Sequence, residues 1–149
     1  MGKRFELEQS ILIDAPVEVV FQYAADYRND VHWRAAVTSM ELSGADPFEV
    51  GVQVREVLRS FGRDVISTGE VTAVEPNRSI TFRSLTGPIP VEGLRSFQAV
   101  EDQTKFIFFL KGELDTFYSI LWIVMSGTYQ RQMADSLNRL KGLIEEQSR

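Results

Sequence analysis

The chain has 149 residues, which suffices for one domain with a substantial hydrophobic core. Its hydrophobic content of 44% and charged content of 25% are those of an ordinary globular protein. The net charge of -5 argues against nucleic-acid binding, which would require a basic patch. The absence of cysteine excludes disulfides and thiolate chemistry, and a single histidine excludes His-rich metal sites.

The N-terminus leads directly into a predicted strand at residues 5–14. No signal peptide precedes this strand, so we expect a soluble cytoplasmic protein. Polar and apolar residues alternate in the first part of this strand, and its end is continuously apolar, as in strands with both faces covered. A helix follows, with Asp14 or Ala15 at its cap and Pro16 in its first turn, where the missing N–H costs nothing. The predicted buried face of this helix consists of Val17, Val20, Phe21 and Ala24.

A short polar segment at 27–33 comes next, and we expect a second small helix or a turn there. Turn residues then divide the following part of the chain into six strands. We expect these strands at 37–43, 52–60, 65–75, 79–85, 91–100 and 104–114. Their short connections, of which 101–103 is the tightest, predict a seven-stranded antiparallel sheet together with the first strand.

Residues 115–146 predict one long amphipathic helix, which Asp115 or Thr116 can cap. We expect it to lie against the sheet, because no other helix is long enough to pair with it. Its apolar residues at three- and four-residue steps are Trp122, Met125, Tyr129, Met133, Leu137, Leu140 and Ile144. Every residue at 117–125 except Ser119 is apolar, so this end should be covered nearly all round by protein or ligand. This run is too short for a bilayer, which needs roughly 20 residues, so we expect no stable membrane insertion.

These features resemble the START-like helix-grip superfamily (SRPBCC), in the branch of polyketide cyclase/dehydrase and lipid transport proteins. The resemblance covers nearly the whole chain, and its segments are 13–21, Ala25 and Asp26 with Trp33, Gly51, 71–76, 100–105 and the C-terminal helix. It implies an α+β fold in a single domain at 1–149, in which a curved seven-stranded sheet grips the long helix around an apolar cavity, with two short helices after the first strand. A Trp-Pro pair is common after the first helix in this superfamily, whereas Arg34 follows Trp33 here.

The pattern within the strands supports part of this picture. One strand carries small residues on one face, which would leave room beneath the helix: Ser67, Gly69, Val71 and Ala73. Large aromatic residues on the other elements either pack a filled core or form the walls of a ligand-sized cavity: Phe82, Phe97, Phe106, Phe108, Trp122 and Tyr129.

Two charged residues are candidates for the cavity. If Phe97 points inward, Arg95 does too, and Glu56 shares a face with Val52 and Val54. A buried guanidinium requires a carboxylate partner or an acidic or carbonyl-bearing ligand. The alternative is that Leu94 points inward and Arg95 reaches water.

Catalytic residues are not assigned. His32 lies in a polar segment, where a surface or cavity-mouth position is favoured over a general base. No glycine-rich phosphate loop and no glycosidase-like carboxylate pair stands out, and we expect neither a metal nor a cofactor.

We therefore expect binding of a small, mostly apolar ligand of aromatic, polyketide-like or lipid type, and leave cyclase or dehydratase activity open. The predicted ligand-binding residues are Glu56, Phe82, Arg95, Phe97, Phe108, Trp122, Met125 and Tyr129. The alternatives are a cochaperone-like protein-interaction module and a quinone or lipid carrier. Residues 106–110 are apolar on both strand faces, which leaves a homodimer open.

Overall fold

The computed structural model describes residues 3–148, apart from the side chain at position 124. The chain forms β1 (Lys3–Ile13), α1 (Val17–Ala24), the 3-10 turn η1 (Tyr27–Asn29), α2 (Asp30–Trp33), β2 (Val37–Leu42), β3 (Gln53–Ser60), β4 (Arg63–Glu75), β5 (Ser79–Thr86), β6 (Val91–Val100), β7 (Gln103–Leu114) and α3 (Thr116–Gln147). The strands make one antiparallel sheet in the order β1-β7-β6-β5-β4-β3-β2. This architecture confirms the predicted α+β helix-grip fold.

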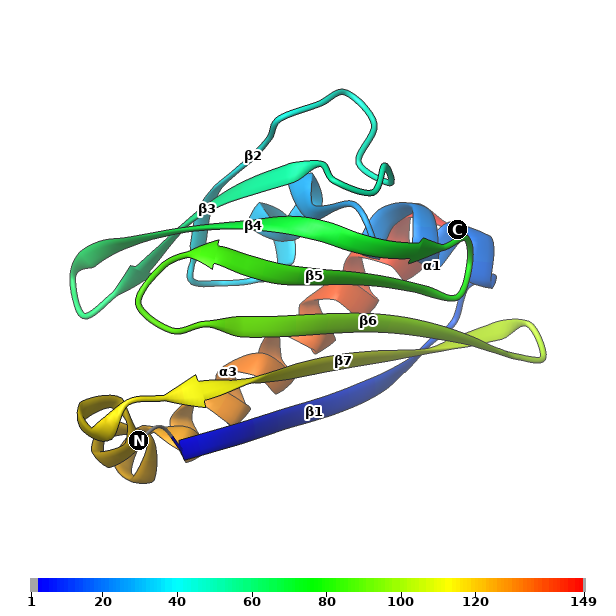
Figure 1. Cartoon of the computed structure of the whole chain (residues 1–149). Coiled ribbons are helices and arrows are strands. Elements are labelled where there is room, and N and C mark those ends of the chain that lie inside the picture. The colour runs from blue at the N-terminus through cyan, green and yellow to red at the C-terminus, as the bar shows by residue number, and fades with distance from the viewer. Residues whose placement is uncertain (1–2, 149) are drawn as a thin grey trace.

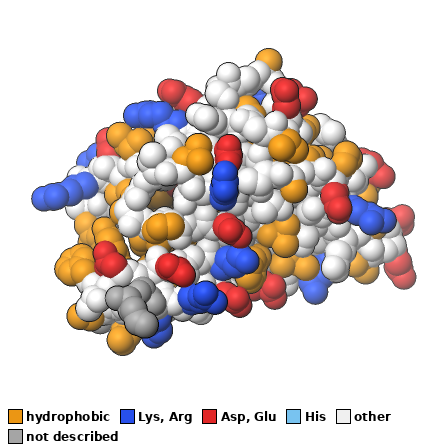
Figure 2. Space-filling view, viewed as in Figure 1, with side chains coloured by type: hydrophobic (Ala, Val, Ile, Leu, Met, Phe, Trp, Pro, Cys, Tyr) orange, Lys and Arg blue, Asp and Glu red, His pale blue; other side chains and the backbone are white. Residues whose placement is uncertain are grey.

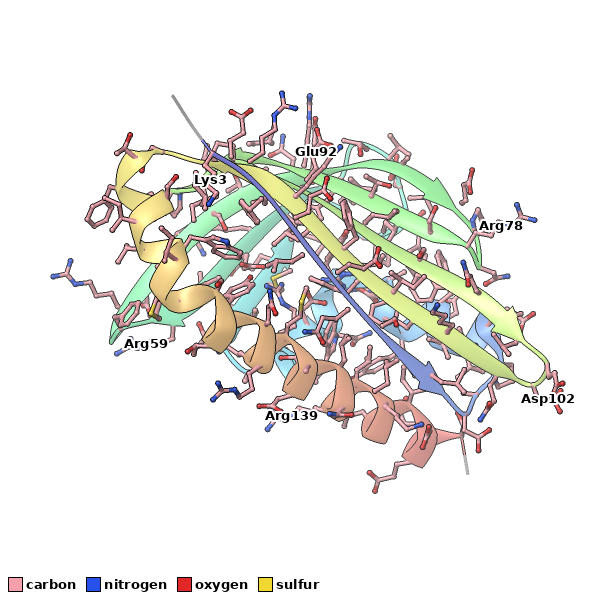
Figure 3. All side chains as sticks on the ribbon, turned by 90° about the horizontal axis from the view of Figure 1, so that it is seen from below. Lys3, Arg59, Arg78, Glu92, Asp102 and Arg139 are labelled. Atoms are coloured by element: carbon pink, nitrogen blue, oxygen red, sulfur yellow. The ribbon has the colours of Figure 1, made fainter. Side chains whose placement is uncertain are left out.

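The helices all lie on one face of the curved sheet, with α3 crossing that face at an angle (Figure 1). The first strand pairs with the last, from Lys3 opposite Leu114 to Ile13 opposite Thr104. Seen from below, side chains fill the space between α3 and the sheet (Figure 3). The residues predicted to be buried there are all in the core: Phe97, Phe106, Phe108, Leu137 and Leu140.

The start of α1 differs from the prediction by one position. Pro16 is itself the N-cap, and the helix begins at Val17. The reason is that the Pro16 carbonyl already accepts the first helical hydrogen bonds, from the N–H groups of Val19 and Val20 at 3.0 and 3.1 Å, whereas its backbone is extended at ψ 151°. No side chain caps this helix among the described residues, so Asp14 does not do so.

A bulge in β4 overturns one part of the small-residue face. Val71 pairs with Phe82 but Ala73 pairs with Thr81, so the register shifts between them. A bulge moves the following residues to the opposite face. Gly69 and Val71 are therefore buried on the inner face as expected, whereas Ala73 is exposed and Val74 packs against the core.

The two halves of α3 have different surroundings. Asp115 caps the helix as predicted, because its side chain accepts a 2.9 Å hydrogen bond from the Tyr118 backbone N–H. The second half buries Met133, Leu137, Leu140 and Ile144 against the sheet, which confirms that stretch of the predicted face.

The first half of α3 is largely uncovered. Phe117, Ile120 and Ile123 are 64%, 63% and 72% exposed. Of the two covers expected for this end, protein or ligand, the described part of the chain supplies the first on one side only, where Trp122 packs on Phe5 with ring centroids 5.0 Å apart. Figure 2 shows the resulting hydrophobic side chains gathered at the lower left, where α3 begins. No helix in residues 3–148 has the length and apolar character needed to cross a membrane.

Gly127 lies inside α3, and three explanations for it are a bend, a close approach to another backbone and a movable gate. A Cβ added there would meet no heavy atom within 4 Å, which excludes the close approach among described residues. We expect Gly127→Ala to raise the free energy of unfolding by about 1 kcal/mol, because alanine is the better helix former. Urea denaturation would measure this change.

Gly142→Ala is a matched control, because Gly142 lies in the same helix and a Cβ there also meets open space. If alanine raised the free energy of unfolding at position 142 but not at position 127, Gly127 would be supporting a bend in the helix that alanine opposes.

Candidate functional site

The inner face of the sheet carries a buried arginine. Arg95 of β6 is 2% exposed, because the alternation of the strand places it on the same face as Phe97. Its Nη1 and Nη2 donate to the two oxygens of Asp30, at 2.8 and 2.6 Å, and Nη1 also donates to the Ala24 carbonyl at 3.0 Å. The alternative in which Arg95 reaches water is therefore wrong, and the carboxylate partner comes from α2.

The ion pairing continues toward β3. Asp30 Oδ2 accepts a second hydrogen bond, at 3.0 Å, from Nη1 of Arg34, and the same Nη1 donates to Glu56 Oε2 at 2.7 Å. We call Arg95, Asp30, Arg34 and Glu56 the inner ion-pair network. Burial acts to lower the pKa of Arg34, but the neighbouring carboxylates of Glu56 and Asp30 raise it above its ordinary value overall. Two cations and two anions leave the network without net charge.

Aromatic rings surround the Arg95 end of the network. The Cζ atom of Arg95 lies 4.4 Å from the centre of the Tyr27 ring, 5.2 Å from that of Trp33 and 5.4 Å from that of Phe108. Such distances give cation–π attraction. Phe82 stands edge-on to Tyr27, with ring centroids 5.7 Å apart. The guanidinium is thus both ion-paired and enclosed by π-systems.

Three polar atoms at this place are buried without a hydrogen-bond partner among the described residues. They are the hydroxyl of Tyr27, the indole Nε1 of Trp33 and Nε of Arg95. Burial strongly raises the pKa of the Tyr27 hydroxyl, and the positive charge of Arg95 only partly offsets this effect. An unsatisfied buried donor costs about 1–3 kcal/mol, so this group of three needs a physical explanation.

Two glycines form the floor beside these rings. A Cβ at Gly93 would lie 2.1 Å from Cε1 of Phe82, and one at Gly69 would lie 3.3 Å from its Cδ2. The Phe82 ring therefore occupies the space that side chains at positions 69 and 93 would otherwise fill. Two hollows of about 540 and 620 Å³ lie elsewhere on the sheet, and neither is lined by a member of the network.

The structure brings most of the predicted site residues together, in two groups. Arg95, Phe82 and Phe108 lie around Tyr27 and Trp33, and Glu56 joins them through Arg34. On α3, Trp122 and Tyr129 have ring centroids 6.2 Å apart.

The remaining predicted site residues are Tyr129, Met125 and Phe97. Tyr129 is 39% exposed. Desolvation raises the pKa of its hydroxyl, while Arg34 acts to lower it and Glu56 to raise it. Met125 is half-buried. Phe97 packs against Phe21 of α1 and Phe106 of β7, at 5.1 and 5.2 Å between ring centroids.

Sequence reasoning missed Tyr27, Asp30 and Trp33 because segment 27–33 reads as polar, and it also missed Arg34 directly after that segment. A signal was present nonetheless: Tyr27, Asp30 and Trp33 recur every three residues and are all buried, whereas His32 between them is exposed. The exposed position of His32 agrees with the surface role favoured for it. No group of three or more metal-ligating side chains occurs in the described part of the chain.

The sequence matches the family model described as polyketide cyclase / dehydrase and lipid transport over residues 4–145. The chain belongs to this family. No curated protein matches it.

Several solved structures share the fold. TTHA0849 from Thermus thermophilus is 22% identical, with a TM-score of 0.82 over 97% of this chain and 100% of that one. The ZhuI aromatase/cyclase from Streptomyces sp. R1128 is 17% identical, with a TM-score of 0.81 over 99% and 97%. The di-domain ARO/CYC StfQ from the steffimycin biosynthetic pathway is 11% identical, with a TM-score of 0.76 over 97% of this chain and 52% of that one. At these identities the likeness establishes the helix-grip fold, which is a fold for hydrophobic ligands in this family.

Proposed function

We propose that the protein binds a small, flat and mostly apolar molecule between α3 and the inner face of the sheet. The observation that carries this proposal is the neutral inner ion-pair network, set among aromatic rings and bearing buried polar atoms without partners. Ligand sites combine an apolar lining with a few polar groups that fix orientation. The proposed contacts are those expected from the sequence: Glu56, Phe82, Arg95, Phe97, Phe108, Trp122, Met125 and Tyr129.

The ligand class is aromatic or polyketide-like. This choice is supported by the ring-lined surroundings of Arg95 and by two neighbours in fold that are aromatase/cyclases. Cyclase or dehydratase activity would then rest on holding a reactive chain in one conformation away from water, with few side chains taking part.

The role of Arg95 in this proposal is to hold the network together. Both of its terminal nitrogens already bind Asp30, so its charge is balanced within the protein. Arg34 is better suited to an acidic end, because its side chain is 20% exposed and both of its ion pairs use Nη1. Its Nη2 and Nε have no hydrogen-bond partner among the described residues.

A fluorescent apolar probe, anilinonaphthalene sulfonate, tests the proposal. We expect binding in the micromolar range, with competition by aromatic carboxylates. Trp122→Ala should lower the affinity for the probe several-fold, because Trp122 is half-buried on the side of α3 that meets Phe5. Its neighbour Ile123 is 72% exposed, so Ile123→Ala is the control and should leave binding unchanged.

A second candidate function is a protein-interaction module, which the exposed apolar start of α3 favours. Phe117, Ile120 and Ile123 offer a contact surface there for a partner, including a second copy of the chain. The probe experiment separates the two candidates. If the probe did not bind, or if Trp122→Ala and Ile123→Ala lowered its affinity equally, the result would contradict the ligand site and favour the interaction surface.

A further inference from the structure

We infer that the Tyr27 hydroxyl and the Trp33 indole N–H are hydrogen-bond donors to acceptor oxygens of the ligand, so that the ligand is an aromatic carbonyl or phenolic compound. This inference rests on the proposed function, since it names the polar group that the same site recognises. Neither Tyr27 nor Trp33 was expected to contact ligand from the sequence.

The unpartnered atoms at this place are donors. An indole N–H and the N–H of an arginine Nε can only donate, and a phenolic hydroxyl can donate or accept. An ammonium group would therefore find no partner at Trp33 or at Nε of Arg95. A carbonyl, phenolic or carboxylate oxygen could accept from any of the three.

The neighbouring protein acceptors are already in use. The two oxygens of Asp30 receive three hydrogen bonds from Arg95 and Arg34, and the Ala24 carbonyl receives another from Arg95. None of these acceptors receives a hydrogen bond from Tyr27, from Trp33 or from Nε of Arg95. An acceptor supplied by the ligand would satisfy donors that otherwise remain buried and unpaired at a cost of about 1–3 kcal/mol each.

Access to these donors requires the movement of a side chain, and Phe82 is the one placed to move. It is only half-buried, it stands edge-on to Tyr27, and its ring lies over Gly93 and Gly69. The two glycines leave a flat space that the ring of Phe82 fills in the free protein. An aromatic ligand ring in this space would lie beside Tyr27, whose hydroxyl could then donate to its oxygen.

Two ligands of nearly equal shape test the inference. Acetylnaphthalene carries a carbonyl oxygen, and ethylnaphthalene carries none. Calorimetric titration of the wild-type protein should show acetylnaphthalene binding roughly tenfold more tightly, as expected for one or two gained hydrogen bonds. Tyr27→Phe should remove most of this preference while leaving the affinity for ethylnaphthalene unchanged.

Tyr23→Phe is the matched control, because Tyr23 lies on α1 close by and is only partly buried. It should retain the full preference. Tyr27→Phe should also unfold at the same or a higher urea concentration than the wild type, since it removes a hydroxyl that has no partner. This result would separate a ligand contact from a structural role.

A measurement on the unaltered protein makes the test independent of any variant. In proton NMR, one tryptophan indole N–H should shift downfield on addition of acetylnaphthalene and not of ethylnaphthalene. Equal affinity of the two ligands, or a preference that survives in Tyr27→Phe, would overturn the inference while leaving the proposed function intact. Failure of both ligands to bind would instead contradict the proposed function.

Discussion

Asp30→Ala is expected to lower the free energy of unfolding by about 3–5 kcal/mol, measured by urea denaturation. The carboxylate of Asp30 is fully buried and holds both terminal nitrogens of Arg95, whose side chain is 2% exposed. Its removal leaves a buried guanidinium without a counter-charge, and breaking one partner of a buried pair is costly for this reason.

Asp64→Ala is the matched control for this variant. Asp64 also pairs with an arginine, Arg59, but both side chains are more than half exposed. Surface pairs of this kind contribute about 0–1 kcal/mol. If Asp30→Ala destabilised the protein no more than Asp64→Ala, Arg95 would have to reach water or another acceptor in solution, and the inner ion-pair network would not hold the site together.

Leu140→Ala is expected to destabilise the protein by about 2–5 kcal/mol, because Leu140 is fully buried where α3 meets the sheet. The same truncation in the first half of the helix, Ile120→Ala, should change the free energy of unfolding by less than about 0.5 kcal/mol, since Ile120 is 63% exposed. Urea or thermal denaturation of both variants measures the contrast between the two halves of α3.

An equally large loss for Ile120→Ala would contradict the exposed position of this half. If that loss disappeared on dilution, a second copy of the chain would be covering Ile120 and its neighbours in solution.

The elements of the fold were predictable from the sequence because local signals mark them. Gly62 follows Phe61 in the tight turn between β3 and β4, where both have positive φ. Asp115 caps α3, and the turn at 101–102 sets the pairing of β6 with β7. Each of these features depends on residues close together in the chain, so pattern and turn chemistry suffice to find them.

The candidate site was predictable only in part. Alternation along β6 gave the inward direction of Arg95 as one of two alternatives, but the identity of its partner depends on packing of α2 against the sheet. Asp30 is 65 positions away in sequence, and no local pattern relates the two. The bulge before Ala73 was hidden for a similar reason, because a register shift is decided by pairing with β5.

The surroundings of the start of α3 were not predictable, because an apolar run indicates that burial is favourable without showing what provides it. Phe117, Ile120 and Ile123 have the composition of a core, yet the sheet ends beside only one side of them. In contrast, the spacing of Leu137, Leu140 and Ile144 specifies one face, and the sheet covers that face.

The pairing of β1 with β7 has a consequence for how the protein is made. β1 leaves the ribosome first, but its only partner strand in the described sheet is the last to be synthesised. The hairpins from β2 to β7 join neighbours in sequence and can form as they emerge, whereas the β1–β7 ladder gives the fold a high contact order. Until that ladder closes, β1 is an unpaired strand with an exposed apolar face and β7 is an open sheet edge. Incomplete chains associate with one another through these two features.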